Sequence, residues 1–300
     1  MSDLTATVDQ SELATDAQFT DMLERVSFQP GILLGADALS AEQTYHLRRL
    51  TRHHRWLIGP GTVFGIRVDV MNPAPPDDPT DVRLTVAPGY AIDGLGREVL
   101  INEAYAISLR DWLAASGSSV AANLISGTLF LRVTVRARAA PQGLQPVTSE
   151  LFDAGLDPVV TSRVGDGFLL EVTGDAKPQR GDTPARPLDT WAPLQATPAA
   201  GDVPGTLTAR EQATLGGIAD AGLHNAMALQ AWLLRQPLPP FDDSPGAEAG
   251  YLEASRLLLA SVHVSLASLT ATPTIAGTAV NNLVRPFVRP NALLAALSLP

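Results

Sequence analysis

Glycine and proline recur so often in this sequence that the chain must consist of short elements joined by many turns. Its 300 residues include 24 prolines and 24 glycines, whereas aromatic residues make up only 5%. No three-residue period accompanies the glycines, which excludes a collagen-like helix. The pattern therefore predicts short strands and helices separated by long irregular connections.

Several segments alternate between apolar and polar residues, as half-buried β-strands do. The clearest runs from Thr128 to Arg138, with apolar side chains on one face and arginine and threonine on the other. We interpret that basic face as solvated. A tight hairpin is expected where Gly94 and Gly96 supply positive φ between two such segments. Further strands are expected at 62–70, 82–86, 90–92, 98–101, 105–109, 167–173 and 257–266.

The best-defined helix is expected at 41–57. Ser40 and Gln43 have the spacing of a capping box, and a Gly-Pro-Gly sequence stops the helix after Ile58. One face of this helix carries Leu47, Leu50, His54 and Leu57. Other helices are expected at 16–26, at 208–235 behind a second capping box, and at 292–297, whereas Ser116-Gly117-Ser118 indicates a loop.

These elements predict an α+β fold that is rich in β-structure, with mixed or antiparallel sheets and three or four helices. We divide the chain into four parts. They are an N-terminal arm with a short helix at 1–27, a β-rich core domain at 28–173, a Pro-rich extended loop with one helix at 174–250, and a C-terminal strand and apolar tail at 251–300 that pack on the core or on a neighbour.

Charge and cysteine content exclude several classes of function. The chain carries 21 basic and 31 acidic residues, a formal net charge of −10, which argues against general nucleic-acid binding. It contains no cysteine, so disulfides, thiolate metal sites and a cysteine nucleophile are excluded. No apolar stretch approaches the roughly 20 residues that cross a bilayer. No secretion signal precedes the first helix.

We find no motif for catalysis, a cofactor or a metal ion, and we expect a protein that is not an enzyme. Gly-x-Ser-x-Gly and the phosphate-binding glycine loop are both absent. His46 and His53 lie two turns apart on one helix face, roughly 10 Å along the axis, which is too far for one ion. Acidic pairs in Pro-rich loops leave a cell-wall hydrolase open as an alternative, and these pairs are Asp77-Asp78 and Asp242-Asp243.

Arginine is concentrated on the helix at 41–57, which is unusual in an acidic chain. Arg48, Arg49, Arg52 and Arg55 are therefore candidates for docking onto an acidic partner surface. Pairing within the chain, for instance with Glu42, is an equal alternative. Charge reversal at Arg48 and Arg52 is expected to prevent docking and to leave the fold intact. A second, weaker set of candidates lies in the C-terminal tail and consists of Arg285, Phe287 and Arg289.

Four strings in the first third of the chain occur in an order that resembles a known group of proteins. They are Phe28–Leu34, Glu42–Arg49, Gly59–Val68 and Pro88–Glu98. This pattern resembles a family of bacterial structural proteins encoded among the genes of phage-tail-like contractile injection systems. It is also similar to regions of phage baseplate and tail-fibre attachment proteins. The resemblance covers residues 28–110 well and is looser beyond them.

The resemblance implies a structural subunit of a contractile tail-like particle, in its baseplate, around its spike or at a fibre attachment. It implies several copies held by contacts with one another and with other subunits, assembly in the cytoplasm, and release as part of an extracellular particle. It brings no catalytic residue with it. A carbohydrate or cell-surface binding module on a tail fibre is the alternative, and a cell-wall hydrolase is the second alternative.

Overall fold

The computed structural model confirms the predicted α+β fold, rich in β-structure. Within the part of the chain that it describes, all three sheets are antiparallel. None of the helices in that part is both long enough and apolar enough to cross a lipid bilayer. The described residues are 22–31, 35–72, 81–146, 159–175, 208–220, 222–224, 227–228, 230, 247–269 and 273–288.

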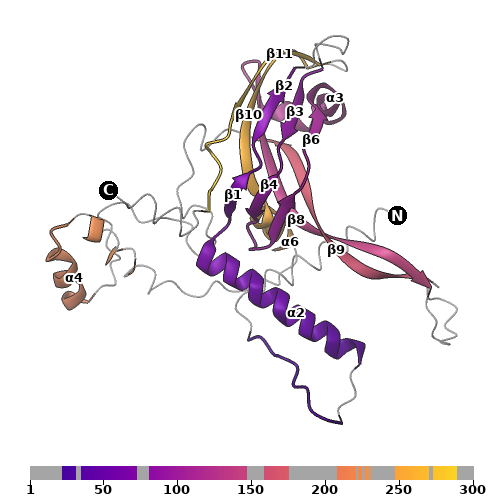
Figure 1. Cartoon of the computed structure of the whole chain (residues 1–300). Helices are drawn as coiled ribbons and strands as arrows, with labels where there is room; N and C mark the ends of the chain where they lie inside the picture. Colours follow the sequence, from indigo (N-terminus) through magenta and orange to yellow (C-terminus); the bar gives the residue numbers. More distant parts are fainter. Residues whose placement is uncertain are drawn as a thin grey trace.

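Two three-stranded sheets form one layer of the core (Figure 1). The first has the order β1-β4-β5 and the second has the order β2-β3-β6. Strands β4 and β5 form the predicted hairpin around the glycine turn. The bounds are β1 Gly61–Gly65, β2 Val68–Met71, β3 Arg83–Val86, β4 Gly89–Ile92, β5 Glu98–Ile101 and β6 Tyr105–Ser108.

The third sheet forms the opposite layer and is built from strands between residues 124 and 281. Its order is β11-β10-β8-β7, and β9 also pairs with β8. Strand β10, from the C-terminal part of the sequence, lies between β8 and β11, so the core extends well beyond the predicted 28–173. The bounds are β7 Leu124–Ile125, β8 Thr128–Pro146, β9 Val159–Gly174, β10 Leu257–Ser268 and β11 Thr274–Asn281.

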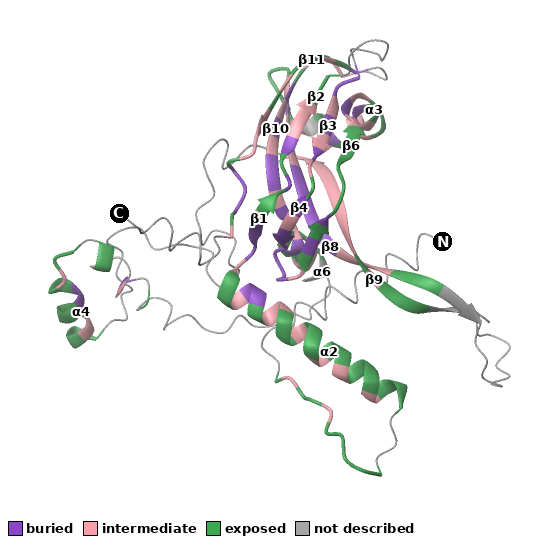
Figure 2. Cartoon of the chain, in the orientation of Figure 1, coloured by how far each residue is buried: buried purple, intermediate pink, exposed green. Residues whose placement is uncertain are grey.

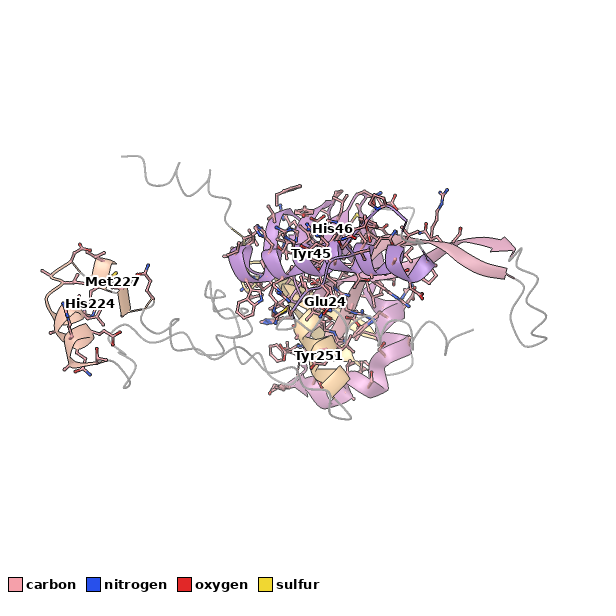
Figure 3. All side chains as sticks on the ribbon, turned by 90° about the horizontal axis from the view of Figure 1, so that it is seen from below. Glu24, Tyr45, His46, His224, Met227 and Tyr251 are labelled. Atoms are coloured by element: carbon pink, nitrogen blue, oxygen red, sulfur yellow. The ribbon has the colours of Figure 1, made fainter. Side chains whose placement is uncertain are left out.

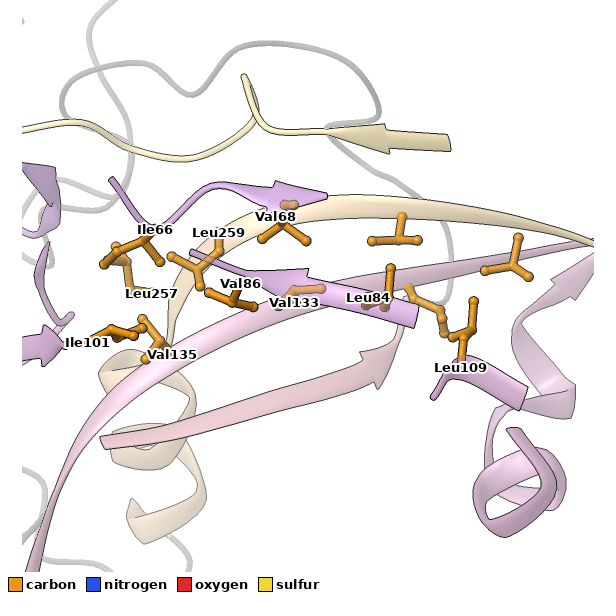
Figure 4. Packing of buried hydrophobic residues seen from close by; sticks show 14 of the residues in the cluster. Ile66, Val68, Leu84, Val86, Ile101, Leu109, Val133, Val135, Leu257 and Leu259 are labelled. Atoms are coloured by element: carbon orange, nitrogen blue, oxygen red, sulfur yellow. The ribbon is translucent and has the colours of Figure 1, made fainter. Parts of the chain in front are cut away.

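The hydrophobic core lies between these two layers (Figure 4). Alternation on β8 turns Leu129, Leu131, Val133 and Val135 inward, and all four are almost completely buried, as the sequence predicted. Across from them lie inward-facing residues of the other layer such as Ile66. Each fully buried aliphatic side chain of this kind stabilises the fold by about 1.5–3 kcal/mol, which makes this interior the main source of stability.

The predicted single strand at 62–70 is wrong, because the chain changes sheets at its centre. Gly65 and Ile66 both have positive φ, 66° and 51°, and they separate β1 from β2. A Cβ atom at Gly65 would overlap the carbonyl oxygen of Pro88. The alternating pattern continues through both strands, so periodicity alone could not reveal the break.

Helix α2 (Ala36–His53) continues into one π-helical segment, η1 (His54–Ile58). The expected capping box at Ser40 is wrong, because the helix begins one turn earlier behind Gly35, without a side-chain cap. Helix α3 (Leu109–Val120) occupies the region expected to be a loop. Its start is fixed by Ser108, whose side chain accepts a hydrogen bond of 3.2 Å from the amide of Asp111.

Helix α4 (Ala209–Gly216) begins at the predicted capping box of Thr208 and Glu211. It ends at two consecutive glycines, so the predicted helix to Arg235 is interrupted, and residues 222–224, 227–228 and 230 are helical again. Helix α6 (Ala247–Ser255), the short 3-10 turn η2 (Ala121–Asn123) and strand β11 were not predicted. Residues 22–26 of the expected first helix are irregular, and residues 1–21, 176–207 and 289–300 lie outside the described part.

The basic face of β8 is covered, not solvated as the sequence suggested. Arg136 is almost fully buried there, 3.7 Å from Glu171 of β9. Next to it, Arg256 contacts Glu171 at 2.9 Å, and Arg132 contacts Glu253 of α6 at 2.6 Å. The acidic residues that neutralise these arginines therefore come from two other elements, one of them more than a hundred residues away in sequence.

Candidate protein-docking site

Helix α2 has no buried residue, although it corresponds to the best-defined helix predicted from the sequence. Figure 2 shows that most of α2 is exposed, and its leucines are among the exposed residues. The exposed fractions are 52% for Leu39, 62% for Leu47 and 47% for Leu50, and Leu57 of η1 is 73% exposed. We call these four residues the leucine stripe. A helix that packs on its own core would turn such a stripe inward.

The other side of α2, which carries its charged residues, lies toward the protein. Glu42, Tyr45, Arg48 and Arg52 are all half-buried, and the Nε atoms of both arginines are inaccessible to solvent. At 100° per residue these four side chains lie opposite the leucine stripe. The leucines of α2 are thus more exposed than the charged residues Glu42, Arg48 and Arg52, which reverses the usual arrangement of an amphipathic helix.

The C-terminal end of α2 is fastened to the β4–β5 hairpin turn. Arg55 donates a hydrogen bond to the carbonyl oxygen of Gly94, and Nδ1 of His54 lies 3.2 Å from the carbonyl oxygen of Gly96. The contact requires glycine, because a Cβ atom at Gly96 would overlap the carbonyl oxygen of Thr51. This joint holds α2 in one orientation relative to the sheets.

Asp93 organises that turn from a fully buried position. Its Oδ1 accepts hydrogen bonds of 2.9 Å from the amides of Leu95 and Arg97. Its Oδ2 accepts one of 2.9 Å from Nε of Arg97 and one of 3.2 Å from the amide of Ala137 on β8. One carboxylate therefore shapes the turn and ties it to the opposite layer.

The structure places the four predicted docking arginines in three different environments. Arg49 is exposed, and its guanidinium donates a hydrogen bond of 3.3 Å to the hydroxyl of Tyr45, labelled in Figure 3. Arg48 and Arg52 are half-buried. Arg55 is only 5% exposed, and burial lowers its pKa to about 10 despite the nearby charge of Asp93. Because its guanidinium is used inside the fold, Arg55 does not fit the predicted docking role.

The C-terminal tail packs on its own chain as far as the structure describes it. Arg285 is 3% exposed and donates to the carbonyl oxygen of Ile66 at 2.7 Å, and burial lowers its pKa to about 10. It therefore joins the tail to the core and is not available as a docking contact. Phe287 is exposed and lies beside Thr62 at the edge of β1. Arg289 lies outside the described residues.

A second exposed apolar group, which the sequence analysis missed, crosses the sheet next to α2. Phe64, Tyr90 and Leu100 stand in register on β1, β4 and β5. The Phe64 and Tyr90 rings are stacked with centroids 6.1 Å apart, and Phe64 and Leu100 are exposed. The only signal was that Val63 and Phe64 are adjacent apolar residues, so one of them must face outward from a strand.

Strands β8 and β9 extend beyond the sheet as a two-stranded ribbon. Strand β10 pairs with β8 only as far as Val135, whereas β9 pairs with it up to Pro146. Figure 1 shows this ribbon projecting from the core. Two-stranded ribbons are marginally stable in water on their own, so this projection is a further surface that another chain could complete.

No catalytic or metal-binding group emerges among the described residues. They contain no group of three histidine, aspartate or glutamate side chains placed to hold a metal ion. His46 is paired with Glu42, one turn away on α2, at 3.1 Å. The acidic pairs Asp77-Asp78 and Asp242-Asp243 lie outside the described part, so the hydrolase alternative stays untested.

No family model matches this chain, and no curated protein matches it with significant similarity. The function therefore has to be inferred from the surfaces of the structure itself. Among them, the leucine stripe is an apolar face that does not pack on the core.

Proposed function

We propose that this chain is a structural subunit of a phage-tail-like contractile injection particle, where it acts through protein–protein contacts. The observation that supports this proposal is the reversed exposure of helix α2, whose leucine stripe faces solvent while Glu42, Arg48 and Arg52 are half-buried. We infer the setting, in the baseplate, around the spike or at a fibre attachment, from the resemblance of residues 28–110. We infer the protein–protein contact from the exposed leucine stripe.

Burial of the stripe by a partner would contribute substantial binding free energy. A leucine side chain gains about 1.5–3 kcal/mol when it passes from full exposure to full burial, and four of them stand on one face. The hydrogen bonds of Arg55 and His54 already hold α2 in place. Little conformational entropy is therefore lost when the partner binds, which favours affinity.

The proposal is tested by incorporation into particles. The tagged chain is expressed in its own host, particles are purified by ultracentrifugation, and the amount of chain per particle is measured by quantitative mass spectrometry. Sheath and tube proteins should co-purify with the wild-type chain. We expect the double variant Leu47→Glu, Leu50→Glu to be lost from the particles at least tenfold, because two buried carboxylates oppose docking.

The matched control is Ala41→Glu, His53→Glu, which adds two glutamates at exposed positions of the same helix outside the stripe. It should be incorporated at the wild-type level. Equal loss of both variants would contradict docking through the leucine stripe, as would normal incorporation of the leucine variant. Absence of sheath and tube proteins from the wild-type preparation would contradict the particle setting itself.

A carbohydrate-binding module is a second candidate, and the exposed ring of Phe64 is the observation that favours it. An amphipathic aromatic surface with Tyr90 beside it can receive the apolar face of a sugar ring. A glycan array with the wild-type chain and with Phe64→Ala decides this question. Binding that the substitution removes would support the module, and no binding to any glycan would dismiss it.

A further inference from the structure

We infer that the partner of the leucine stripe is the same stripe on a second copy of this chain, with the two α2 helices antiparallel. This inference rests on the proposed function, because it names one of the partners that the docking face receives. Three features of α2 support it: the absence of charge on the exposed face, the spacing of the leucines and the fixed orientation of the helix.

The face around the stripe carries no aspartate, glutamate, lysine or arginine. At 100° per residue, the uncharged face covers an arc of about 140° of the helix surface. Chains with a net charge of −10 repel one another at most surfaces, but a face without charge can meet its own copy without opposing like charges. The residues of this arc on α2 are Ala36, Leu39, Ser40, Gln43, Thr44, Leu47, Leu50 and Thr51, and the uncharged residues Leu57 and Ile58 follow on η1.

The intervals between the leucines are nearly the same when they are read from the N-terminal or from the C-terminal end of the helix. Leu39 lies eight residues before Leu47, and Leu57 lies seven residues after Leu50. An antiparallel pair therefore brings Leu39 next to Leu57 of the partner subunit and Leu47 next to Leu50 of the partner subunit. Two-fold symmetry makes both ends of the contact equivalent, as in most protein homodimers. Antiparallel helix dipoles favour this direction.

The contact with the hairpin turn fixes the orientation of the helix, which favours a single geometry for such a pair. The backbone of the β4–β5 turn holds His54 and Arg55, so the exposed face of α2 keeps its direction relative to the sandwich. The two copies would thus have one defined relative orientation, which a repeating assembly requires.

The size of the contact predicts a moderate affinity. Helix α2 has 18 residues and is therefore about 27 Å long. One helix face of this length is smaller than the roughly 800 Å² that each partner contributes to a typical stable interface. We expect dimerisation at micromolar concentration, which becomes effectively complete when many copies are held together in one particle.

Sedimentation velocity of the purified full chain, from low to high micromolar concentration, tests the pairing. The wild-type chain and the control Ala41→Glu, His53→Glu should pass from monomer to dimer. The variant Leu47→Glu, Leu50→Glu should weaken the association at least tenfold. A wild-type chain that stays monomeric at the highest concentration would overturn the inference, as would a leucine variant that associates like the wild type.

The absence of cysteine permits a second test, of helix direction. Leu39→Cys and Leu57→Cys are prepared as separate proteins and treated with a short bis-maleimide. In an antiparallel pair the mixture forms cross-linked dimers, whereas each protein alone does not, because its two cysteines lie about 27 Å apart. Self-cross-linking of each protein alone would show a parallel pair and overturn the inferred geometry, and Ala41→Cys, at an exposed position away from the two-fold axis, controls for random collision.

The two experiments separate this inference from the proposed function. Incorporation that depends on the stripe, together with a monomeric chain in solution and no cross-linking, would leave the structural role intact and dismiss the second copy as partner. Dimerisation through the stripe without sheath or tube proteins in the preparation would dismiss the particle setting and retain the pairing.

Discussion

The carboxylate of Asp93 accepts a hydrogen bond of 3.2 Å from the backbone amide of Ala137, which connects the hairpin turn of one layer with the central strand of the other. The same turn receives Arg55 from the end of α2 through the carbonyl of Gly94. On its other side, the amide of Gly94 donates a 3.2 Å hydrogen bond to the carbonyl of Ser255. Two helices and two sheets thus meet at one five-residue turn.

Substitution of Asp93 by asparagine should lower the free energy of unfolding by about 3 kcal/mol, because an amide nitrogen cannot accept a hydrogen bond and the half-buried Arg97 loses its counter-charge. Urea denaturation followed by circular dichroism measures this change. Asp69→Asn is the control, since its ion pair with Arg67 is exposed and should contribute less than about 0.5 kcal/mol. Similar effects of both substitutions would contradict the central role of Asp93.

The sequence was sufficient to predict the hairpin but not the joint that it forms. Gly94 and Gly96 lie between two apolar segments, and this local pattern specifies a tight turn. The partners of the turn come from 39 or more residues away, and nothing in the spacing of Ala137 or Ser255 points to it. The burial of Asp93 therefore could not be predicted from the pattern.

The orientation of α2 shows a similar limit for the candidate site. The period of Leu47 and Leu50 correctly predicts an amphipathic helix, but periodicity does not say which face meets the core. The sequence therefore suggested the arginines as docking residues, whereas the exposed side chains in the structure favour the leucines. Burial of Arg55 and Arg285 had no local signal, because the carbonyl groups that accept their hydrogen bonds belong to distant segments.

Alanine at Gly94 should destabilise the joint between the hairpin turn and α6. A Cβ atom there would overlap the carbonyl oxygen of Ala254, which belongs to rigid helix backbone. We expect a loss of about 2 kcal/mol on urea denaturation. Gly250→Ala is the control within α6, because its Cβ atom would meet nothing and alanine favours helix by up to about 1 kcal/mol. A tolerated Gly94→Ala would show that α6 is not fixed at this turn.

The attachment of α6 should weaken in acid. Burial alone would raise the pKa of Glu253, but hydrogen bonds from Arg132 and Arg256 outweigh it and hold the pKa below the usual 4.5. Because the folded state prefers the ionised form, this stabilisation is fully present above pH 4.5 and is lost as the pH falls through the lowered pKa. The contribution is at most about 1 kcal/mol, since Glu253 is half exposed.

Unfolding measured between pH 6 and pH 3 should therefore show a smaller loss of stability in Glu253→Gln than in the wild-type chain, because glutamine does not titrate. Glu103→Gln is the control, since this residue contacts only the exposed Tyr105 hydroxyl. Identical pH profiles of Glu253→Gln and the wild-type chain would rule out the proposed ionic attachment.

Charge reversal on α2 should distinguish the two sides of the helix by their effect on folding. From the sequence, the fold was expected to tolerate charge reversal at Arg48 and Arg52, but both are half-buried with inaccessible Nε atoms. A carboxylate placed there loses solvation, so Arg52→Glu should lower the free energy of unfolding by about 1–2 kcal/mol. Arg49→Glu, at an exposed position, should change it by less than about 0.5 kcal/mol.

Thermal and urea denaturation of these two variants, beside Leu47→Glu, would locate the solvent-facing side of α2 in solution. Leu47→Glu should be as stable as the wild-type chain, because its side chain is 62% exposed. The opposite order, with the leucine variant unstable and Arg52→Glu unaffected, would mean that α2 packs its stripe against its own chain. In that case the leucine stripe could not receive a second copy without first leaving the core.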